Sequence, residues 1–283
     1  MKIKKKYQGI FFIICAAFFF SLMTFFVRLA GDVPTFQKSF FRNIVAAVFA
    51  VSILARSEEK FKVLSTSWIS LFLRAGFGTA ALIANFYAVD HMNLADANIL
   101  NKLSPFFAIL MSRVILKEKP SKQDLITVFI AFAGAVLVAK PTGNMGILPA
   151  ALGIFGGFGA GVAYTFVRKM GMQGERGAVI VAFFSVFSTL VTLPSLLFDY
   201  HPMTMNQLLC LVFAGFAGMG GQFSITKAYT KAPAKEISVY DYTQVLFAAM
   251  LGLVFFDQVP DVYSLTGYII IIGAAIFRTL RLS

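Results

Sequence analysis

Long apolar runs, separated by short polar turns, follow one another along the whole chain. Ten runs can be delimited, and each approaches the roughly 20 apolar residues that a helix needs to cross a bilayer. Gly and Pro residues mark most of the breaks between runs. Membrane strands are excluded, because they have roughly 9–11 residues of alternating polarity and these runs are longer and do not alternate. The pattern predicts ten transmembrane helices over residues 7–29, 35–55, 68–89, 95–116, 123–140, 147–168, 178–198, 207–227, 236–256 and 262–280.

The composition agrees with a chain that lies mostly within lipid. Hydrophobic residues make up 58% of the 283 residues and charged residues 13%, against about 45–50% and about 25% in soluble domains. A water-soluble fold could not bury this excess of apolar residues. These proportions exclude a soluble enzyme, a nucleic-acid-binding protein, a disulfide-rich scaffold and a disordered chain. The predicted fold class is therefore an all-α integral membrane protein in a lipid bilayer.

The net charge of +12 follows the membrane topology and does not indicate a nucleic-acid partner. With the N-terminus in the cytoplasm, the loops and tails that carry most of the Lys and Arg residues all fall on the cytoplasmic side, as the positive-inside rule requires. Ten spans then place both termini in the cytoplasm. Residues 7–29 are too long for a cleaved signal sequence and are expected to remain as the first helix. The opposite loops are acidic, with Lys140 as a basic exception: they hold Asp32, Asp90, Asp199, Asp257 and Asp261.

An internal repeat relates the two halves of the chain. The triplet Phe26-Val27-Arg28 recurs as Phe166-Val167-Arg168, and the same offset of 140 residues places Pro120 on Pro260. Five helices per half is an odd number, so the second half must cross the membrane in the opposite orientation. Inverted repeats are typical of secondary transporters, which bind substrates near the midplane between the halves. The predicted domains are residues 1–143 and 144–283.

Four short motifs stand at the ends and centres of the predicted spans: Phe41-Arg42-Asn43, Phe86-Tyr87-Ala88-Val89, Ser104-Pro105-Phe106 and Tyr242-Thr243-Gln244. Together with the five-plus-five pattern, they resemble the EamA-type family of the drug/metabolite transporter superfamily over nearly the whole chain. The second half departs from the family at Gln258, where an acidic residue is common, and at Val245, where Pro is common. The resemblance implies transport of small organic solutes, often amino acids or related metabolites, by alternating access.

Ionisable side chains inside the predicted spans mark candidate functional positions, because each costs about 2.5–3.5 kcal/mol at the centre of a membrane helix. Lys102 shares a helix face with Asn98 and Asn101, and Pro105 frees a backbone carbonyl on that face. The 140-residue offset places Asp241 on Asn101. The polar faces of the two halves are therefore expected to meet at the repeat interface.

Lys102 and Asp241 are expected to line opposite parts of a cavity without pairing. Counted along straight helices, they lie about 7 Å and about 6 Å from opposite membrane surfaces, which leaves roughly 15 Å between them. A zwitterionic solute could meet each residue in turn. The alternative is that each pairs with a neighbour, Lys102 with Asp96 and Asp241 with Lys235.

The side chains of Arg42 and Arg74 could line the cavity. They could also extend along their helices to the membrane surface, as long basic side chains often do. Arg42 is the stronger candidate because it belongs to one of the family motifs, whereas Arg28 is expected to anchor the topology. Tyr164 and Tyr240 are candidates to stack on a solute. The predicted substrate-binding residues are Arg42, Asn98, Asn101, Lys102, Tyr164, Tyr240, Asp241 and Gln244.

Small and polar residues within the spans leave two interpretations open. Gly153, Gly157 and Gly161 have the spacing either of a close helix contact or of a hinge. Asn85 and Gln222 could line a cavity or could join helices by hydrogen bonds.

The predicted function is secondary transport of a small organic metabolite, with amino acids or related zwitterions favoured. The sequence has no His pair at metal spacing, nucleophile elbow or Walker loop, so no enzymatic activity, cofactor or metal is predicted. Asp241 is the one acid well within a predicted span and is the candidate for proton coupling. The alternatives are a carrier of organic cations, drugs or nucleotide-like metabolites, a channel, and a lipid-carrier translocase. Short tails without a transit segment are typical of a multi-pass protein of a bacterial plasma membrane.

Overall fold

The computed structural model describes residues 2–91, 94–139, 146–256, 259 and 261–282. Within these residues the chain forms helices and turns, with no strand. The predicted loop residues Lys140, Asp257 and Gln258 lie outside them. The helices are α1 (Lys2–Leu29), α2 (Thr35–Arg56), η1 (Ser65–Ser67), α3 (Trp68–His91), α4 (Leu94–Asn101), α5 (Ser104–Leu116), α6 (Lys122–Ala139), α7 (Ile147–Gln173), α8 (Gly177–Phe198), α9 (Met205–Lys231), α10 (Ala234–Ile237), η2 (Ser238–Tyr242), α11 (Thr243–Phe256) and α12 (Val262–Leu282).

The long helices follow the apolar runs closely. In the described part of the chain, eight segments are long and apolar enough to cross a membrane, and Val262–Phe277 is a shorter apolar helix. A helix suits these runs because it satisfies every backbone hydrogen bond within one segment, as lipid requires. The prediction of an all-helical integral membrane protein is therefore confirmed.

Two of the predicted spans are interrupted, which corrects the expectation of continuous helices over 95–116 and 236–256. The first breaks between α4 and α5, where Pro105 occupies the first turn of α5 and its missing N–H costs no hydrogen bond. The second passes through η2, a tighter 3₁₀ segment. Non-helical backbone at membrane depth is tolerated where protein surrounds it, so both breaks belong in the interior of the bundle.

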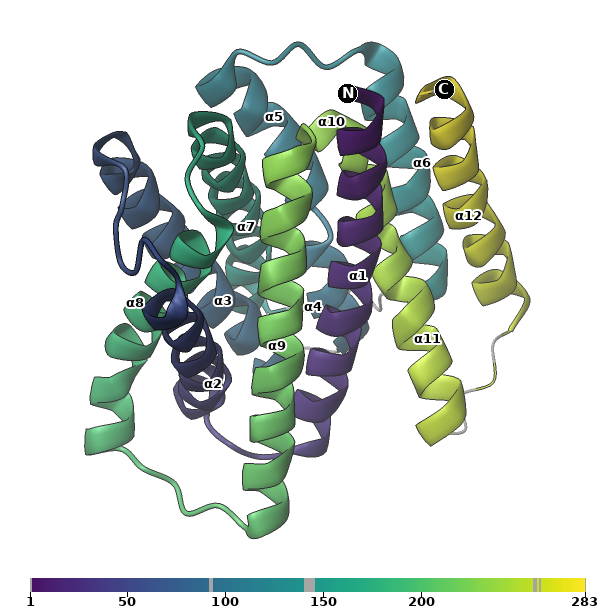
Figure 1. The fold of residues 1–283 in the computed structure, drawn as a ribbon. Helices are drawn as coiled ribbons and strands as arrows, with labels where there is room; N and C mark the ends of the chain where they lie inside the picture. The colour runs from purple at the N-terminus through teal and green to yellow at the C-terminus, as the bar shows by residue number, and fades with distance from the viewer. Residues whose placement is uncertain (1, 92–93, 140–145, 257–258, 260, 283) are drawn as a thin grey trace.

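The helices pack in pairs that repeat with the 140-residue offset. Helix α1 packs on α9, and its counterpart α7 packs on α3; likewise α1 contacts α11 and α7 contacts α5. Figure 1 shows α1 between α9 and α11. Helices α2 and α8, which are counterparts, pack on each other, as do α6 and α12. The two halves are thus interleaved, and the interface between them runs through the centre of the bundle.

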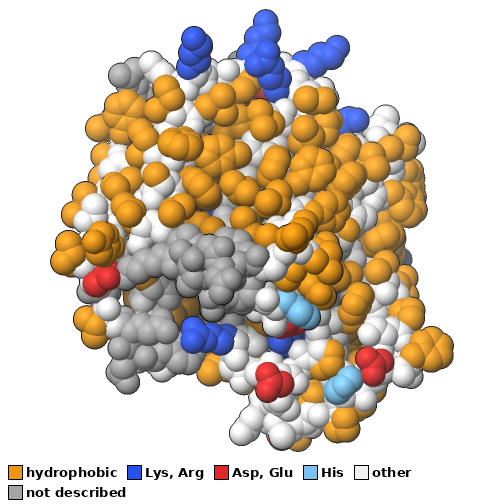
Figure 2. All heavy atoms as spheres, turned by 180° about the vertical axis from the view of Figure 1, so that it is seen from behind, with side chains coloured by type: hydrophobic (Ala, Val, Ile, Leu, Met, Phe, Trp, Pro, Cys, Tyr) orange, Lys and Arg blue, Asp and Glu red, His pale blue; other side chains and the backbone are white. Residues whose placement is uncertain are grey.

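Charged side chains separate toward the two ends of the bundle. The N- and C-termini lie at the same end (Figure 1). Figure 2 shows Lys and Arg side chains projecting from one edge, Asp, Glu and His side chains mostly toward the other, and a broad hydrophobic band between them. Large apolar side chains such as Phe129, Ile269 and Val254 are exposed, as expected of a protein whose surface faces lipid tails.

The glycine stripe of α7 packs directly against the α4–α5 break. A Cβ atom on Gly157 would lie 2.8 Å from the carbonyl oxygen of Leu100, and one on Gly161 would lie 2.6 Å from the Cβ of Phe107. Gly153 likewise faces Leu100. Of the two interpretations of this stripe, the structure shows the close helix contact.

Candidate functional site

A polar cavity of about 120 Å³ lies at the centre of the bundle, where both helix breaks meet α1, α2, α3, α7, α8 and α9. Both halves of the chain contribute side chains to it. All of the predicted binding residues except Tyr240 line this cavity. Its polar side chains are Thr24, Arg42, Arg74, Asn85, Asn98, Asn101, Lys102, Ser104, Tyr164, Gln222, Asp241 and Gln244.

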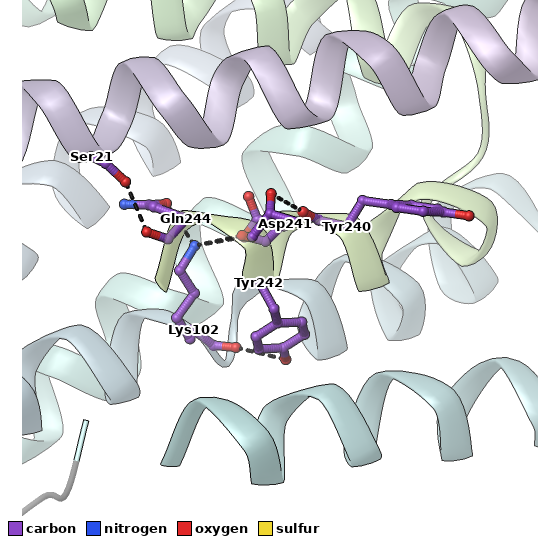
Figure 3. Close-up of polar contacts among 7 residues, drawn as sticks. Ser21, Lys102, Tyr240, Asp241, Tyr242 and Gln244 are labelled. Carbon is purple, nitrogen blue, oxygen red and sulfur yellow. Dashed lines mark hydrogen bonds and ion pairs between the residues drawn. The ribbon is translucent and has the colours of Figure 1, made fainter. Parts of the chain in front are cut away.

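Lys102 bridges the two halves by an ion pair with Asp241 (Figure 3). The Nζ atom of Lys102 donates to Oδ2 of Asp241 at 2.9 Å, to the Asp241 carbonyl at 3.3 Å and to Oε1 of Gln244 at 2.6 Å. The Tyr242 hydroxyl donates to the Lys102 carbonyl at 3.1 Å, and the Ser21 hydroxyl donates to the Gln244 carbonyl at 2.8 Å. Because an ammonium group has three donors, Lys102 is saturated by protein acceptors here.

The expectation that Lys102 and Asp241 lie apart was wrong. It treated each span as a straight helix and ignored the reach of the side chains. In the structure, Lys102 lies at the break between α4 and α5, and Asp241 lies in η2, between α10 and α11. The two segments meet where α5 contacts η2, and the four-carbon Lys stem spans the remaining gap. Of the alternative partners, the Asp96 side chain lies outside the described residues, and the Nζ atom of Lys235 donates to the Lys119 carbonyl at 3.1 Å.

Tyr240 is the predicted binding residue that the structure places elsewhere. Its side chain is buried in the hydrophobic core cluster and points away from Lys102 (Figure 3). Consecutive residues point about 100° apart in an α-helix and about 120° apart in a 3₁₀-helix, so Tyr240 turns away from the cavity when Asp241 faces it. Tyr164 does line the cavity, where its ring stacks on Tyr229 with centroids 5.0 Å apart.

Arg42 is buried on the cavity wall, so it does not snorkel to the surface. It is 1% exposed, and its Nη1 atom donates to Oδ1 of Asn43 at 2.6 Å. Its Nε atom lies 3.3 Å from the sulfur of Met23. A Cβ atom on Gly218 of α9 would stand 2.8 Å from the same Nε atom, so the absent side chain at Gly218 makes room for the guanidinium group.

Arg74 is also buried, at 2% exposure. Its Nη2 atom donates to Oε1 of Gln222 at 2.7 Å, and its guanidinium carbon lies 3.6 Å from the ring centroid of Phe184. The Nε and Nη1 atoms of Arg74 have no hydrogen-bond partner in the described part of the chain. The Arg42 guanidinium faces the same Phe184 ring, with its carbon 5.9 Å from the centroid.

The cavity is positively charged, and its charge is unevenly divided between the halves. Arg42, Arg74 and Lys102 all come from the first half, and Asp241 from the second. The repeat counterparts of the two arginines are Ala182 and Ala214, both buried. Among the described residues, neither arginine has a carboxylate within ion-pair distance, whereas Lys102 has Asp241. The lining therefore carries two positive charges that no acidic side chain compensates.

Sequence reasoning named most of the polar side chains of this lining as candidates and missed three of its residues. Arg74, Asn85 and Gln222 were open candidates, and their polarity within an apolar span was a usable signal. Phe184 was missed, because a chain with 33 Phe residues offers no local signal that singles out the ring lying under two arginines. Ser104 and Thr24 were also missed, since isolated hydroxyl residues are common in membrane helices.

The chain resembles known transporters along its whole length. It matches the EamA-like transporter family over residues 7–140 and again over residues 147–280. An "Uncharacterized transporter" of Helicobacter pylori is 27% identical over 96% of this chain and 94% of its own. The "Pseudopaline exporter CntI" of Pseudomonas aeruginosa is 28% identical over 95% of each chain. A crystal structure at 17% identity has the same fold, with a TM-score of 0.83 over 97% of each chain.

These matches agree with the architecture, since the family covers both halves and the central polar cavity lies where they meet. The chain therefore belongs to the EamA-like transporter family, within the drug/metabolite transporter superfamily.

Proposed function

We propose that this protein is a secondary transporter that carries a small organic metabolite across the plasma membrane by alternating access. The observation that carries the proposal is the polar cavity at the interface of the two halves, whose lining includes the Lys102–Asp241 bridge between them. A carrier needs a central site that can open to one side of the membrane and then to the other. The exporter relative from Pseudomonas aeruginosa supports movement of an organic solute.

Ten spans in two inverted halves, residues 1–143 and 144–283, form the proposed scaffold, with both termini in the cytoplasm. The two family matches begin 140 residues apart, and both termini lie at one end of the bundle (Figure 1). The Tyr242 hydroxyl donates a hydrogen bond to the carbonyl of Lys102, which is the repeat counterpart of Tyr242. Counterparts can touch only near the axis that relates the halves, which supports a site close to the membrane midplane.

Alternating access is supported by two aromatic contacts between the halves, which the 140-residue repeat relates to each other. Phe18 of α1 meets Phe247 of α11 edge-on with ring centroids 5.4 Å apart. Their counterparts Phe158 of α7 and Phe107 of α5 meet in the same way, also at 5.4 Å. Two equivalent contacts on opposite sides of the site are what a rocking mechanism requires, since one can separate as the other closes. A channel would instead need one continuous pore.

The carried solute is expected to have a carboxylate, as amino acids and related zwitterions do. Two uncompensated arginines line the cavity, and guanidinium groups bind carboxylates through paired hydrogen bonds. The same charges disfavour the organic-cation alternative, because a cation would add positive charge to a site that already has an excess.

Solute counterflow in proteoliposomes tests the proposal. Vesicles containing the purified protein are loaded with unlabelled solute, and uptake of the labelled solute is followed. A carrier gives a transient overshoot, and a pore gives none. A proton gradient is then collapsed with an uncoupler, and Asp241→Asn is compared with the native protein. Concentrative uptake that survives both changes would rule out proton coupling through Asp241, and absence of counterflow for every solute class would contradict the carrier proposal.

The ion pair at the cytoplasmic ends of α5 and α7 is expected to hold that side closed. The Nε atom of Arg168 lies 3.3 Å from Oε1 of Glu118, with both side chains largely buried. Glu118→Gln removes this ion pair, which contributes about 1 kcal/mol to the closed state. Its loss should therefore shift the equilibrium about fivefold toward the inward-open state. Labelling of a single cysteine at Ala163, on the cavity wall, by an impermeant maleimide from the cytoplasmic face should increase by that factor.

Glu59→Gln is the matched control, because it breaks the exposed Arg176–Glu59 pair and leaves the α5–α7 contact intact. Equal labelling in the two variants would show that Arg168–Glu118 does not act as a gate.

A further inference from the structure

We infer that Arg42, Arg74 and Phe184 form an anion-binding subsite, and that the carried solute is a dicarboxylate. The inference rests on the proposed transporter function and names the substrate class of the same cavity. It differs from the neutral zwitterion that the sequence favours, and the difference comes from the charges that the structure places around the cavity.

The first step concerns the charge that the protein itself leaves uncompensated. Lys102 and Asp241 neutralise each other, and all three Lys102 donors are occupied. Arg42 and Arg74 remain, buried at 1% and 2% exposure and without a carboxylate partner among the described residues. A buried charge without a counter-charge is strongly unfavourable. An anionic ligand that supplies two negative charges would compensate both arginines, whereas a neutral zwitterion would leave the excess unchanged.

The second step concerns donors that point at nothing in the protein. Nε and Nη1 of Arg74 are buried and lack hydrogen-bond partners in the described part of the chain, and Arg74 lines the cavity. Buried polar atoms of native proteins are almost always hydrogen-bonded. Nη2, which both bidentate edges of the guanidinium group share, is already bonded to Gln222, so Nε and Nη1 are separate donors that can each bind one ligand oxygen. These atoms are therefore best explained as two donors left free for the oxygens of an anionic ligand.

The third step concerns how the two arginines are held. Phe184 lies beneath both guanidinium groups, at 3.6 Å from Arg74 and 5.9 Å from Arg42, and cation–π contact keeps them in place without neutralising them. Gly78 and Gly218 are repeat counterparts, and a Cβ atom on each would stand 3.1 Å and 2.8 Å from the Arg74 Nη1 and Arg42 Nε atoms, respectively. The backbone is thus shaped to seat two cations side by side.

The fourth step concerns the size and chemistry of the solute. The arginines come from two different helices, α2 and α3, so a single small ligand can contact both if it carries an acidic group at each end. A cavity of about 120 Å³ suits a short chain and excludes a bulky ring system in this conformation. Short aliphatic dicarboxylates combine two charges, two planar binding groups and a small volume.

Binding measurements on the purified full-length protein in detergent test the inference. Succinate is the probe, compared with butyrate, alanine, putrescine and a phosphate monoester at constant chloride concentration, by calorimetry and thermal shift. We expect succinate to bind at least about tenfold more tightly than butyrate, and Arg42→Gln or Arg74→Gln each to weaken succinate at least about tenfold. Arg74→Lys, which keeps the charge but has a single donor nitrogen, should lie between native and Arg74→Gln.

Arg113→Gln is the matched control, since Arg113 is exposed and does not line the cavity; its succinate affinity should equal that of the native protein. Succinate binding that is absent, or equal in Arg74→Gln and Arg113→Gln, would overturn the inference. Binding of the phosphate monoester alone would overturn the assignment to carboxylates. Tight binding of alanine alone would overturn the dicarboxylate and leave the carrier intact, whereas succinate binding without counterflow would contradict transport and leave the subsite standing. Arg74→Lys keeps the test decisive if the Gln variants do not fold.

Discussion

Lys102→Met is expected to cost about 3–5 kcal/mol of stability and to abolish transport. The substitution removes the cation that faces the buried Asp241 carboxylate at 2.9 Å, and breaking a buried ion pair on one side leaves an uncompensated charge. It also removes the bond from Nζ to Gln244, 2.6 Å long, which ties α11 to the α4–α5 break. The melting temperature in detergent and counterflow in proteoliposomes measure the two effects.

The double variant Lys102→Met/Asp241→Asn separates stability from function. Removing both charges leaves no uncompensated ion, so most of the lost stability should return, whereas transport should stay absent because the bridge between the halves is gone. Glu59→Gln, at an exposed ion pair, is the control and should change stability by about 1 kcal/mol or less. A melting temperature for Lys102→Met equal to that of Glu59→Gln would show that the bridge contributes little.

The helices could be predicted from the sequence because lipid leaves the backbone little choice. Every apolar run of sufficient length must satisfy its own hydrogen bonds, so hydropathy alone located the elements to within a few residues. The repeat was also visible, because the offset of 140 residues holds without gaps from Phe26 to Pro260. Both signals are local or periodic, and neither depends on how the helices pack.

The Lys102–Asp241 bridge could not be predicted from such signals. It depends on two interruptions, at Asn101–Ser104 and at Ser238–Tyr242, that bring the chain segments together at the centre of the bundle. Pro105 indicated the first interruption, but no proline lies within the second, where η2 packs against α1, α5, α6 and α12. Depth counted along straight helices therefore overestimated the separation of the two side chains.

The sequence predicts which polar residues line the cavity, but it does not predict which of them form ion pairs with each other. Arg42, Lys102 and Asp241 were found because a charge inside an apolar run is conspicuous. Which cation Asp241 would neutralise decides the net charge of the cavity and with it the class of solute. That choice is set by the positions of helices far apart in the sequence, as the 139-residue separation of Lys102 and Asp241 illustrates.

Gly161→Val is expected to cost about 3 kcal/mol, the upper end of the range for overpacking, and to reduce transport strongly. A Cβ atom at this position would lie 2.6 Å from the Cβ of Phe107 and 2.7 Å from the backbone nitrogen of Ala108. Backbone atoms cannot rotate away, so α7 would have to separate from α5. The Thr165 hydroxyl, which bonds to the Gly161 carbonyl and reaches the Ala108 carbonyl, lies at the same crossing and would move with it.

The loss of transport follows from the position of this crossing relative to the site. The stripe that includes Gly161 also carries Gly157, which covers the Leu100 carbonyl at the α4–α5 break, and Lys102 stands at that break. Gly76→Val is the matched control: a Cβ atom there meets nothing within 4 Å, and valine is no worse than glycine in a helix interior. Melting temperatures of the two variants in detergent, with counterflow measured alongside, distinguish the effects. If Gly161→Val is as stable and as active as Gly76→Val, the close contact between α7 and α5 does not hold the break in place, and the Lys102–Asp241 bridge must be positioned by α1 and η2 instead.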